Sequence, residues 1–197
     1  MTNSMNALIL AGGENKRLPI LKGFLEIDGK RIIESNIDLL ERIFDKVIIS
    51  TNNPEHYFYL GRPMIGDTMR ERGPMTGILS ALNLPEISEI FVTACDMPFI
   101  SGELIRSIVD QWDTKWDAVI PLFDKKPQPL LGIYSQHIAQ NMENSIKNGT
   151  RSLRKFLEGI HVLYISEKAV RSIDREGKSF ININTPEDVE NVIGRST

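Results

Sequence analysis

The chain has 197 residues, 41% of them hydrophobic and 25% charged, which is the size and composition of a single globular domain over residues 1–197. Its formal net charge of −3 argues against a protein whose main activity is binding nucleic acid or an anionic membrane. The single cysteine, Cys95, excludes a disulfide framework and a cysteine-rich zinc site, and favours a reducing, cytoplasmic compartment.

Strands rich in Val and Ile alternate with helices along the first two thirds of the chain. The apolar periodicity predicts, in order, a strand at Ala7–Leu10, a helix at Arg31–Phe44, a strand at Lys46–Ser50, a short helix at Pro54–Leu60, a strand at Pro63–Gly66, a helix at Met75–Leu84, a strand at Glu89–Thr93, a helix at Gly102–Trp112 and a strand at Ala118–Leu122. We therefore expect an α/β fold, a three-layer, doubly wound, mostly parallel sheet with helices on both faces. No apolar run has the length of a secretion signal or a membrane helix, so we expect neither export nor membrane insertion.

The last third of the chain is less regular. It predicts a strand at Gln128–Ser135, helices at Gln136–Asn148 and Ser152–Leu157, strands at His161–Ile165 and Ser179–Ile183, and a last helix that starts near Pro186. In open α/β sheets, ligands bind outside the carboxyl ends of the strands. We therefore expect functional residues in the segments that directly follow strands.

The segment after the first strand reads LAGGENKRLPILK, Leu10–Lys22. Gly12 and Gly13 let the backbone turn sharply and bring its N–H groups close to an anion. Arg17 and Lys22 supply positive charges within reach of a polyphosphate. The segment matches neither a Walker A loop nor a dinucleotide fingerprint. This order of residues favours a phosphate-binding loop over a plain turn with two surface cations.

A carboxylate follows the strand that ends near Thr93. Asp96 lies in ACDMPFI, where Pro98 restrains the chain just beyond it, so a divalent cation could join Asp96 to phosphate oxygens. The alternative is an Asp that closes the turn into the next helix. Cys95 is expected to be a small buried residue rather than a nucleophile.

A glycine-containing loop, Asp67–Ile78, leads into the helix predicted from Met75. Gly73 and Gly77 shape this loop, and the helix N-terminus could accept a phosphate or let a flat base lie against the backbone. The alternative is an ordinary helix start with solvated arginines. The spacing alone does not decide between them.

Polar residues gather in two C-terminal segments. Asn182 and Asn184 precede a helix start at Thr185–Pro186 and could bond a ligand or close a turn. In KNGTRSLRKF, the cations of positions 151, 154 and 155 share one helical face and could meet a second anion, although a solvated helix face is the alternative.

Taken together, these segments resemble the molybdenum cofactor guanylyltransferases, a family of Rossmann-like nucleotidyltransferases, across nearly the whole chain. The matching residues are LAGG at Leu10–Gly13 with Arg17 and Lys22, GPMTGI at Gly73–Ile78, CDMPF at Cys95–Phe99, QPLLGIY at Gln128–Tyr134 and ININTPED at Ile181–Asp188. The GG of LAGG and the GPMTGI loop resemble the guanylyl branch rather than the cytidylyl branch, which tends to carry LAAG.

The resemblance implies transfer of GMP from GTP to the phosphate of Mo-molybdopterin, which forms the molybdopterin guanine dinucleotide cofactor and releases pyrophosphate. It implies catalytic roles for Arg17, Lys22 and Asp96, with Mg²⁺ bound by Asp96. The GTP-binding residues that it implies are Leu10, Ala11, Gly12, Gly13, Lys22, Asn52, Asp67, Gly73 and Asp96. Since the N-terminal half then accounts for GTP, we expect the pterin substrate to be faced by Arg151, Arg154, Lys155, Asn182 and Asn184.

Two positions depart from the family pattern. Pro19 stands where the family commonly has Gly, which stiffens the first loop, and Ser50 stands where a nucleotide-contacting Asn is expected, with Asn52 two residues on. Other interpretations are a nucleotidyltransferase of the same fold, either one that transfers CMP to molybdopterin or one that acts on a sugar phosphate, and a non-catalytic nucleotide-binding regulator. Transient contacts with cofactor-delivering or molybdoenzyme-maturation proteins are left open.

Overall fold

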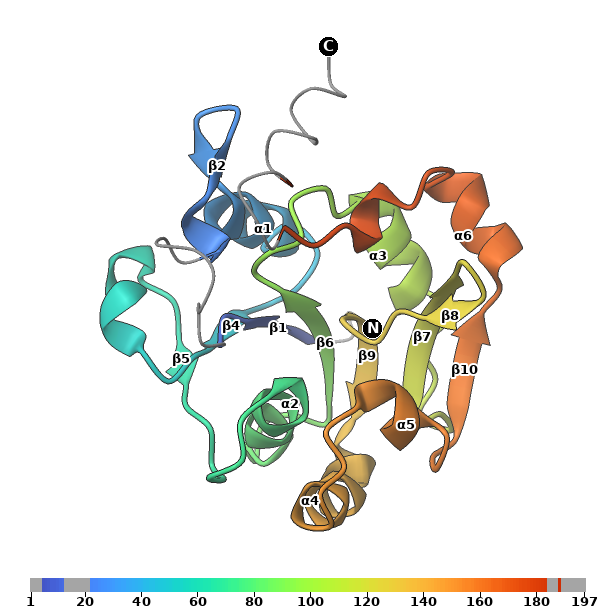
Figure 1. Cartoon of the computed structure of the whole chain (residues 1–197). Helices are drawn as coiled ribbons and strands as arrows, with labels where there is room; N and C mark the ends of the chain where they lie inside the picture. Colours follow the sequence, from blue (N-terminus) through green and yellow to red (C-terminus); the bar gives the residue numbers. More distant parts are fainter. Residues whose placement is uncertain (1–4, 13–21, 184–187, 189–197) are drawn as a thin grey trace.

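The computed structural model describes residues 5–12, 22–183 and 188, and shows a central eight-stranded sheet with helices on both faces (Figure 1). The strands follow the order β10-β7-β9-β6-β1-β4-β5, and β8 pairs with β7. They are β1 (Asn6–Leu10), β4 (Val47–Ser50), β5 (Met64–Ile65), β6 (Glu89–Ala94), β7 (Ala118–Phe123), β8 (Lys126–Pro127), β9 (Leu131–Ser135) and β10 (Val162–Ile165). Strand β9 runs antiparallel to β6 and β7, whereas β1 is parallel to β4 and β6. The predicted mostly parallel α/β sheet is confirmed.

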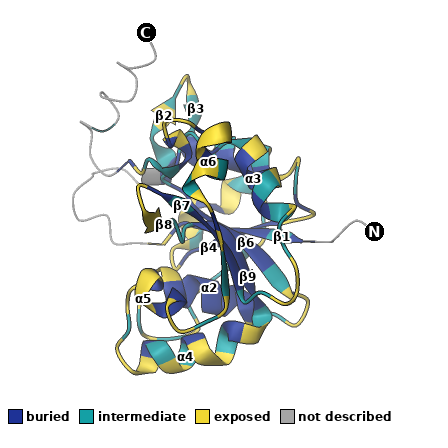
Figure 2. Cartoon of the chain, turned by 90° about the vertical axis from the view of Figure 1, so that its right-hand side faces the viewer, coloured by how far each residue is buried: buried dark blue, intermediate teal, exposed yellow. Residues whose placement is uncertain are grey.

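Helices form a layer on each face of the sheet (Figure 2). One layer holds α1 (Ile32–Leu40), α3 (Gly102–Val109) and α6 (Glu167–Ile173), and the other holds α2 (Pro74–Leu82), α4 (Ala139–Lys147) and α5 (Leu153–Leu157). Alternate residues of β1 serve the two cores: Ala7 and Ile9 belong to the first, and Leu8 and Leu10 to the second. A strand covered on both faces needs apolar side chains in succession, which explains its uninterrupted apolar run. No helix among the described residues is long and apolar enough to cross a membrane.

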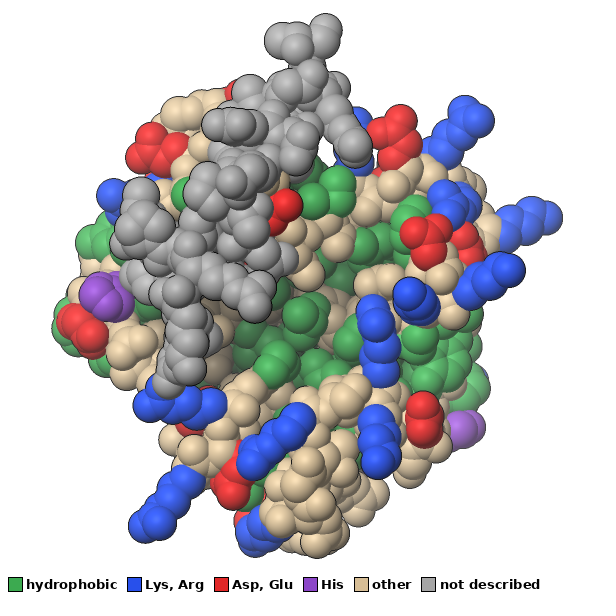
Figure 3. Space-filling view, viewed as in Figure 1, with side chains coloured by type: hydrophobic (Ala, Val, Ile, Leu, Met, Phe, Trp, Pro, Cys, Tyr) green, Lys and Arg blue, Asp and Glu red, His purple; other side chains and the backbone are tan. Residues whose placement is uncertain are grey.

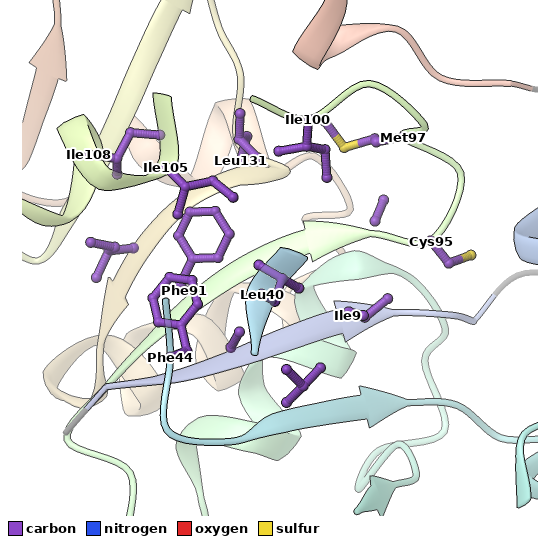
Figure 4. Packing of buried hydrophobic residues seen from close by; sticks show 14 of the residues in the cluster. Ile9, Leu40, Phe44, Phe91, Cys95, Met97, Ile100, Ile105, Ile108 and Leu131 are labelled. Atoms are coloured by element: carbon purple, nitrogen blue, oxygen red, sulfur yellow. The ribbon is translucent and has the colours of Figure 1, made fainter. Parts of the chain in front are cut away.

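Aromatic and branched side chains fill the core under α1 and α3 (Figure 4). The rings of Phe44 and Phe91 stack with centroids 4.9 Å apart. Ile105 and Ile108 of α3 are fully buried in the same cluster. Burial of each such side chain contributes about 1.5–3 kcal/mol to the free energy of folding. This core therefore stabilises the sheet from whose edge the loops extend.

The predicted strand at Ser179–Ile183 is wrong. The chain forms a short 3-10 helix, η5 (Lys178–Phe180), and then an irregular segment. The Ser179 Oγ atom accepts a hydrogen bond from the Ser101 N–H at 3.0 Å, and the Ile183 N–H donates to the Asp96 carbonyl at 2.9 Å. These bonds to the loop after β6 replace a strand ladder. The helix predicted from Pro186 lies outside the described residues, apart from Asp188.

Short elements account for the other differences. The segment Pro54–Leu60 forms two 3-10 turns, η2 (Pro54–His56) and η3 (Phe58–Leu60), rather than one helix. A short hairpin, β2 (Glu26–Ile27) with β3 (Lys30–Arg31), was not predicted, although its Asp28-Gly29 turn has both residues at positive φ, as a tight hairpin requires. Helix α6 was not predicted either; it begins after Ser166, whose hydroxyl accepts the Ala169 N–H.

Close packing of β9 against β7 requires a glycine. A Cβ atom at Gly132 would lie 2.7 Å from the Val119 carbonyl oxygen and 2.6 Å from the Ile120 Cδ1 atom. We expect Gly132→Ala to lower the free energy of unfolding by about 1–3 kcal/mol, since backbone in a central strand cannot move aside. Urea denaturation measures the loss. Gly159→Ala is the matched control because its nearest atom, the Phe156 oxygen, is 3.6 Å away; equal stability of the two variants would contradict the packing argument.

Candidate active site

A cavity of about 460 Å³ lies at the carboxyl ends of β1, β4 and β5. It is lined by Leu10, Gly12, Ser50, Asn52, Asn53, Asp67, Arg72, Gly73, Pro74 and Gly77. The cavity brings together five residues that the sequence analysis assigned to nucleotide binding, from three segments far apart in the chain. These are Leu10, Gly12, Asn52, Asp67 and Gly73. We call this space the first cavity.

Helix α2 points its N-terminus at the first cavity. Gly73 precedes the helix with φ 142°, a backbone conformation that favours glycine, and Pro74 takes the first helical position. A Cβ atom at Gly77 would lie 2.6 Å from the Ser50 Oγ atom and 2.8 Å from a Leu10 methyl carbon. Gly77 therefore lets the helix start approach the ends of β1 and β4, while Gly73 provides the turn that leads into it. Backbone N–H groups at such a start suit an anionic ligand.

Backbone hydrogen bonds fix the first residues beyond β1. The Ala11 N–H donates to the Ser50 carbonyl at 2.8 Å, and the Ala11 carbonyl accepts the Tyr57 hydroxyl at 3.2 Å. Tyr57 is buried, which raises the pKa of its phenol, so the hydroxyl keeps the proton that it donates. Its ring meets Phe24 edge-on at 5.4 Å, in the turn η1 (Lys22–Phe24). Tyr57 thus contacts Ala11 near the start of the predicted phosphate-binding segment and Phe24 in the turn at its end, and no motif in the sequence marked it.

Asp96 follows the buried Cys95 in the loop after β6 and is half-buried. The Cys95 N–H donates to the Leu10 carbonyl at 3.1 Å, which holds this loop beside the end of β1. A Cβ atom at Gly23 would meet the Cys95 Cβ atom at 3.2 Å, so the turn that carries Lys22 lies against the same loop. Cys95 therefore holds the loop that carries Asp96 against the end of β1 and against the turn at Lys22–Phe24.

A second cavity, of about 270 Å³, lies on the other side of Pro74. It is lined by Pro74, Met97, Gln128, Pro129, Leu130, Leu131, Ser152, Leu153, Arg154, Phe180 and Asn182. Figure 3 shows a hollow with hydrophobic side chains near the centre of this face, bordered by Lys and Arg side chains. Pro74 lines both cavities, so the two spaces meet at the start of α2.

Of the residues predicted to face the second substrate, Arg154 and Asn182 line the second cavity. The Arg154 Nε atom donates to the Pro127 carbonyl at 3.0 Å, which holds the guanidinium over the β7–β8 hairpin. Arg151 and Lys155 are exposed and are not lining residues. The predicted helical face shared by 151, 154 and 155 is wrong for Arg151, because α5 begins only after Ser152, whose hydroxyl accepts the Lys155 N–H.

The Gln128–Leu131 segment lines the second cavity but received no role from the sequence. Because β9 runs antiparallel to β6, with Leu131 opposite Thr93, the residues that precede β9 reach the same sheet edge as those that follow β6. The buried Tyr134 hydroxyl donates to the Pro129 carbonyl at 2.7 Å and fixes this approach. The QPLLGIY motif marks this segment in the sequence, although the segment precedes its strand rather than following it.

Several of the site residues predicted from the sequence fall in parts of the chain that the structure does not describe. Gly13, Arg17 and Asn184 lie outside the described residues, as does the departure at Pro19, and for Lys22 only the backbone turn is described. Within the described part of the chain, no group of three or more His, Cys, Asp or Glu side chains could hold a metal ion. Among the described residues, Asp96 therefore belongs to no group of three or more such side chains.

The sequence model described as "MobA-like NTP transferase domain" matches residues 7–167. The chain belongs to this family. A probable molybdenum cofactor guanylyltransferase of Natranaerobius thermophilus is 33% identical over 195 residues, covering 96% of this chain and 95% of the relative. A molybdenum cofactor guanylyltransferase of Syntrophotalea carbinolica is 31% identical over 186 residues, covering 94% and 89%.

Solved structures agree with this membership of the MobA-like family. Molybdopterin-guanine dinucleotide biosynthesis protein A from Archaeoglobus fulgidus superposes with a TM-score of 0.83 at 28% identity, covering 98% of each chain. CMP:2-keto-3-deoxy-manno-octonic acid synthetase superposes with a TM-score of 0.70 at 12% identity, which shows a shared fold alone. The nucleotidyltransferase-like α/β fold implied by the resemblance is confirmed.

We expect Tyr57→Phe to weaken binding of a nucleoside triphosphate by about 3- to 10-fold while the protein stays folded, because it removes one buried hydrogen bond to Ala11. Isothermal titration calorimetry with GTP and Mg²⁺ measures the affinity. Tyr164→Phe, which removes a hydroxyl from a partly exposed ring on β10, is the matched control and should bind GTP as the unaltered protein does. Unchanged affinity in Tyr57→Phe would show that Ala11 is held without the phenol.

Proposed function

We propose that this member of the MobA-like family transfers GMP from GTP to the phosphate of Mo-molybdopterin. The products are the molybdopterin guanine dinucleotide cofactor and pyrophosphate. The observation that carries the proposal is the pair of cavities that meet at Pro74 beside the ends of β1 and β6. A group transfer between two large substrates needs two adjoining sites, and guanylyltransferase relatives match the chain over nearly its full length.

GTP occupies the first cavity in this proposal. The backbone of Leu10–Gly13 and the N-terminus of α2 face its phosphates, and Lys22 neutralises their charge. The nucleoside lies against Asn52, Asp67 and the Gly73 loop, which form the opposite wall. The glycine-lined start of α2 supports this placement, since the absence of side chains lets a flat base or a phosphate approach the backbone.

The residues present fit a magnesium ion. Mg²⁺ is commonly held by one or two carboxylates together with substrate phosphates, and Asp96 offers one carboxylate on a loop fixed by two backbone hydrogen bonds. Asp96 would hold the ion, which when bound supplies positive charge to the phosphates. Arg17 and Lys22 add fixed positive charge in this proposal.

The reaction needs no protein nucleophile. An oxygen of the pterin phosphate attacks the α-phosphorus of GTP, the bond from that phosphorus to the bridging oxygen breaks, and pyrophosphate leaves. Cys95 is buried, in agreement with a packing role. What the chain contributes is the alignment of the two substrates and the stabilisation of charge that develops on the phosphates, which are the main sources of catalysis in such transfers.

Mo-molybdopterin occupies the second cavity in this proposal. Met97, Leu131 and Phe180 supply apolar surface for a flat ring system, and Asn182 supplies hydrogen bonds. Arg154 meets the anionic part of the substrate, while Arg151 and Lys155 add charge outside the cavity. Asn184 completes the polar group in the same C-terminal segment.

Pyrophosphate release tests the function. With Mg²⁺ and molybdopterin that carries molybdenum, we expect turnover with GTP to exceed turnover with CTP or ATP. Asp96→Ala should lower GTP turnover on the order of 10²-fold or more, since it removes a group that stabilises charge at the reacting phosphates.

Two controls make this result interpretable. Asp113→Ala, which changes an exposed carboxylate in the α3–β7 connection, should retain normal turnover. Near-normal activity of Asp96→Ala would contradict the metal assignment. GTP turnover that does not depend on added molybdopterin would contradict the acceptor.

Arg154→Gln should raise the KM for Mo-molybdopterin about 10-fold with little change in the KM for GTP, because it removes the positive charge that lines the second cavity. Lys168→Gln removes a positive charge from an exposed position on α6 that lines neither cavity and should change either KM by less than about 2-fold. Steady-state kinetics with each substrate varied in turn measure both constants. Equal effects of the two variants would show that the substrate senses overall charge rather than the Arg154 side chain.

A further inference from the structure

We infer that Asn52 is a positioning residue that serves the nucleotide through Asp67, by fixing the carboxylate that meets the nucleoside. The inference rests on the proposed GTP site. It assigns Asn52 a different role from the direct nucleotide contact that the sequence suggested for this region, where Ser50 replaces the expected Asn.

Asn52 and Asp67 bond each other reciprocally. The Asn52 Nδ2 atom donates to the Asp67 Oδ2 atom at 2.7 Å, and the Asp67 backbone N–H donates to the Asn52 Oδ1 atom at 2.8 Å. One N–H group and the oxygen of the Asn52 amide therefore both bond the same residue. Because one bond holds the backbone and the other holds the carboxylate, Asn52 fixes both the position and the direction of Asp67.

The chain on either side of Asp67 is also held. The Thr51 N–H donates to the Ile65 carbonyl at 2.8 Å, which continues the pairing of β4 and β5 up to this point. The Thr68 N–H donates to the Ser80 Oγ atom of α2 at 2.9 Å. Asp67 itself bonds no other residue of the described chain than Asn52. Its side-chain direction therefore depends on that amide.

A carboxylate held in this way is a preorganised acceptor. Asn52 occupies one site on Oδ2, so further lone pairs of the Asp67 carboxylate can accept N–H or O–H groups of the nucleoside. Both partners line the first cavity and remain accessible to a ligand. Without the amide, the Asp67 side chain would have to lose its rotational freedom on binding GTP, which lowers affinity.

A double-mutant cycle tests the inference. With Mg²⁺ and GTP, calorimetry should show that Asn52→Ala weakens binding about 10-fold, the order expected for losing a bond to a charged group. Asp67→Ala should weaken binding at least as much, and Asn52→Ala should add less than 2-fold in the Asp67→Ala protein. Asn83→Ala, an exposed amide at the end of α2, is the matched control and should bind GTP normally.

A polarity swap separates positioning from stability. In the double variant Asn52→Asp with Asp67→Asn, the new carboxylate at 52 can accept both the backbone N–H of residue 67 and the new amide there. Both hydrogen bonds between residues 52 and 67 are then restored, but the negative charge lies on residue 52 instead of residue 67. We expect its melting temperature to recover to that of the unaltered protein, while GTP affinity stays at least 10-fold weaker.

Two results would overturn the inference: additive losses in the cycle, which would mean that Asn52 contacts the nucleotide independently, or full GTP affinity in the swapped protein. If Asn52→Ala does not fold, as circular dichroism would show, the swapped protein alone decides. A failure of the proposed function is distinguishable, because the unaltered protein would then not bind GTP or release pyrophosphate at all.

Discussion

The parallel pairing of β1 with β4 and β6 is the constraint on which the candidate site depends. Leu10 lies opposite Ser50 on one side and Ala94 on the other, so three segments leave the sheet at one edge. The ladder continues one residue further, through the bonds from Ala11 to Ser50 and from Cys95 to Leu10. Among the described residues, those proposed to meet the triphosphate at the ends of β1 and β6 are therefore positioned by the sheet itself.

The same edge receives one segment from the opposite direction. Since β9 is antiparallel to its neighbours, the Gln128–Leu131 segment arrives where the loop after β6 departs. The second cavity forms between them and α5. The reversed direction of β9 thus places the second cavity next to the first, and Pro74 at the start of α2 forms a wall common to both.

The sequence predicted what depends on local pattern. The run Ala7–Leu10 identified a strand buried on both faces, and the glycines at 12, 73 and 77 indicated segments that line the first cavity, where Gly77 packs closely against Ser50 and Leu10. The order of the motifs was enough to indicate the family. Such features are visible because apolar periodicity and glycine placement follow from the secondary structure itself.

The sequence could not predict contacts between distant polar residues. Tyr57 donates a hydrogen bond to the Ala11 carbonyl, and Asn52 donates one to Asp67. Neither contact corresponds to a periodic pattern of residues in the sequence. The Ser179–Ile183 segment had the composition of a strand, but bonds to Ser101 and Asp96 decided its conformation. Tertiary partners here override local propensity, as they commonly do for β-rich sequences.

The bond between Ile183 and Asp96 also bears on the order in which the protein assembles. The residues of the first cavity all lie between Leu10 and Gly77, whereas the second cavity needs Phe180 and Asn182. A chain that emerges from the ribosome N-terminus first can therefore gather the lining of the first cavity early, whereas the lining of the second cavity is complete only once Phe180 and Asn182 have been synthesised. Closing such a sequence-distant contact costs loop entropy.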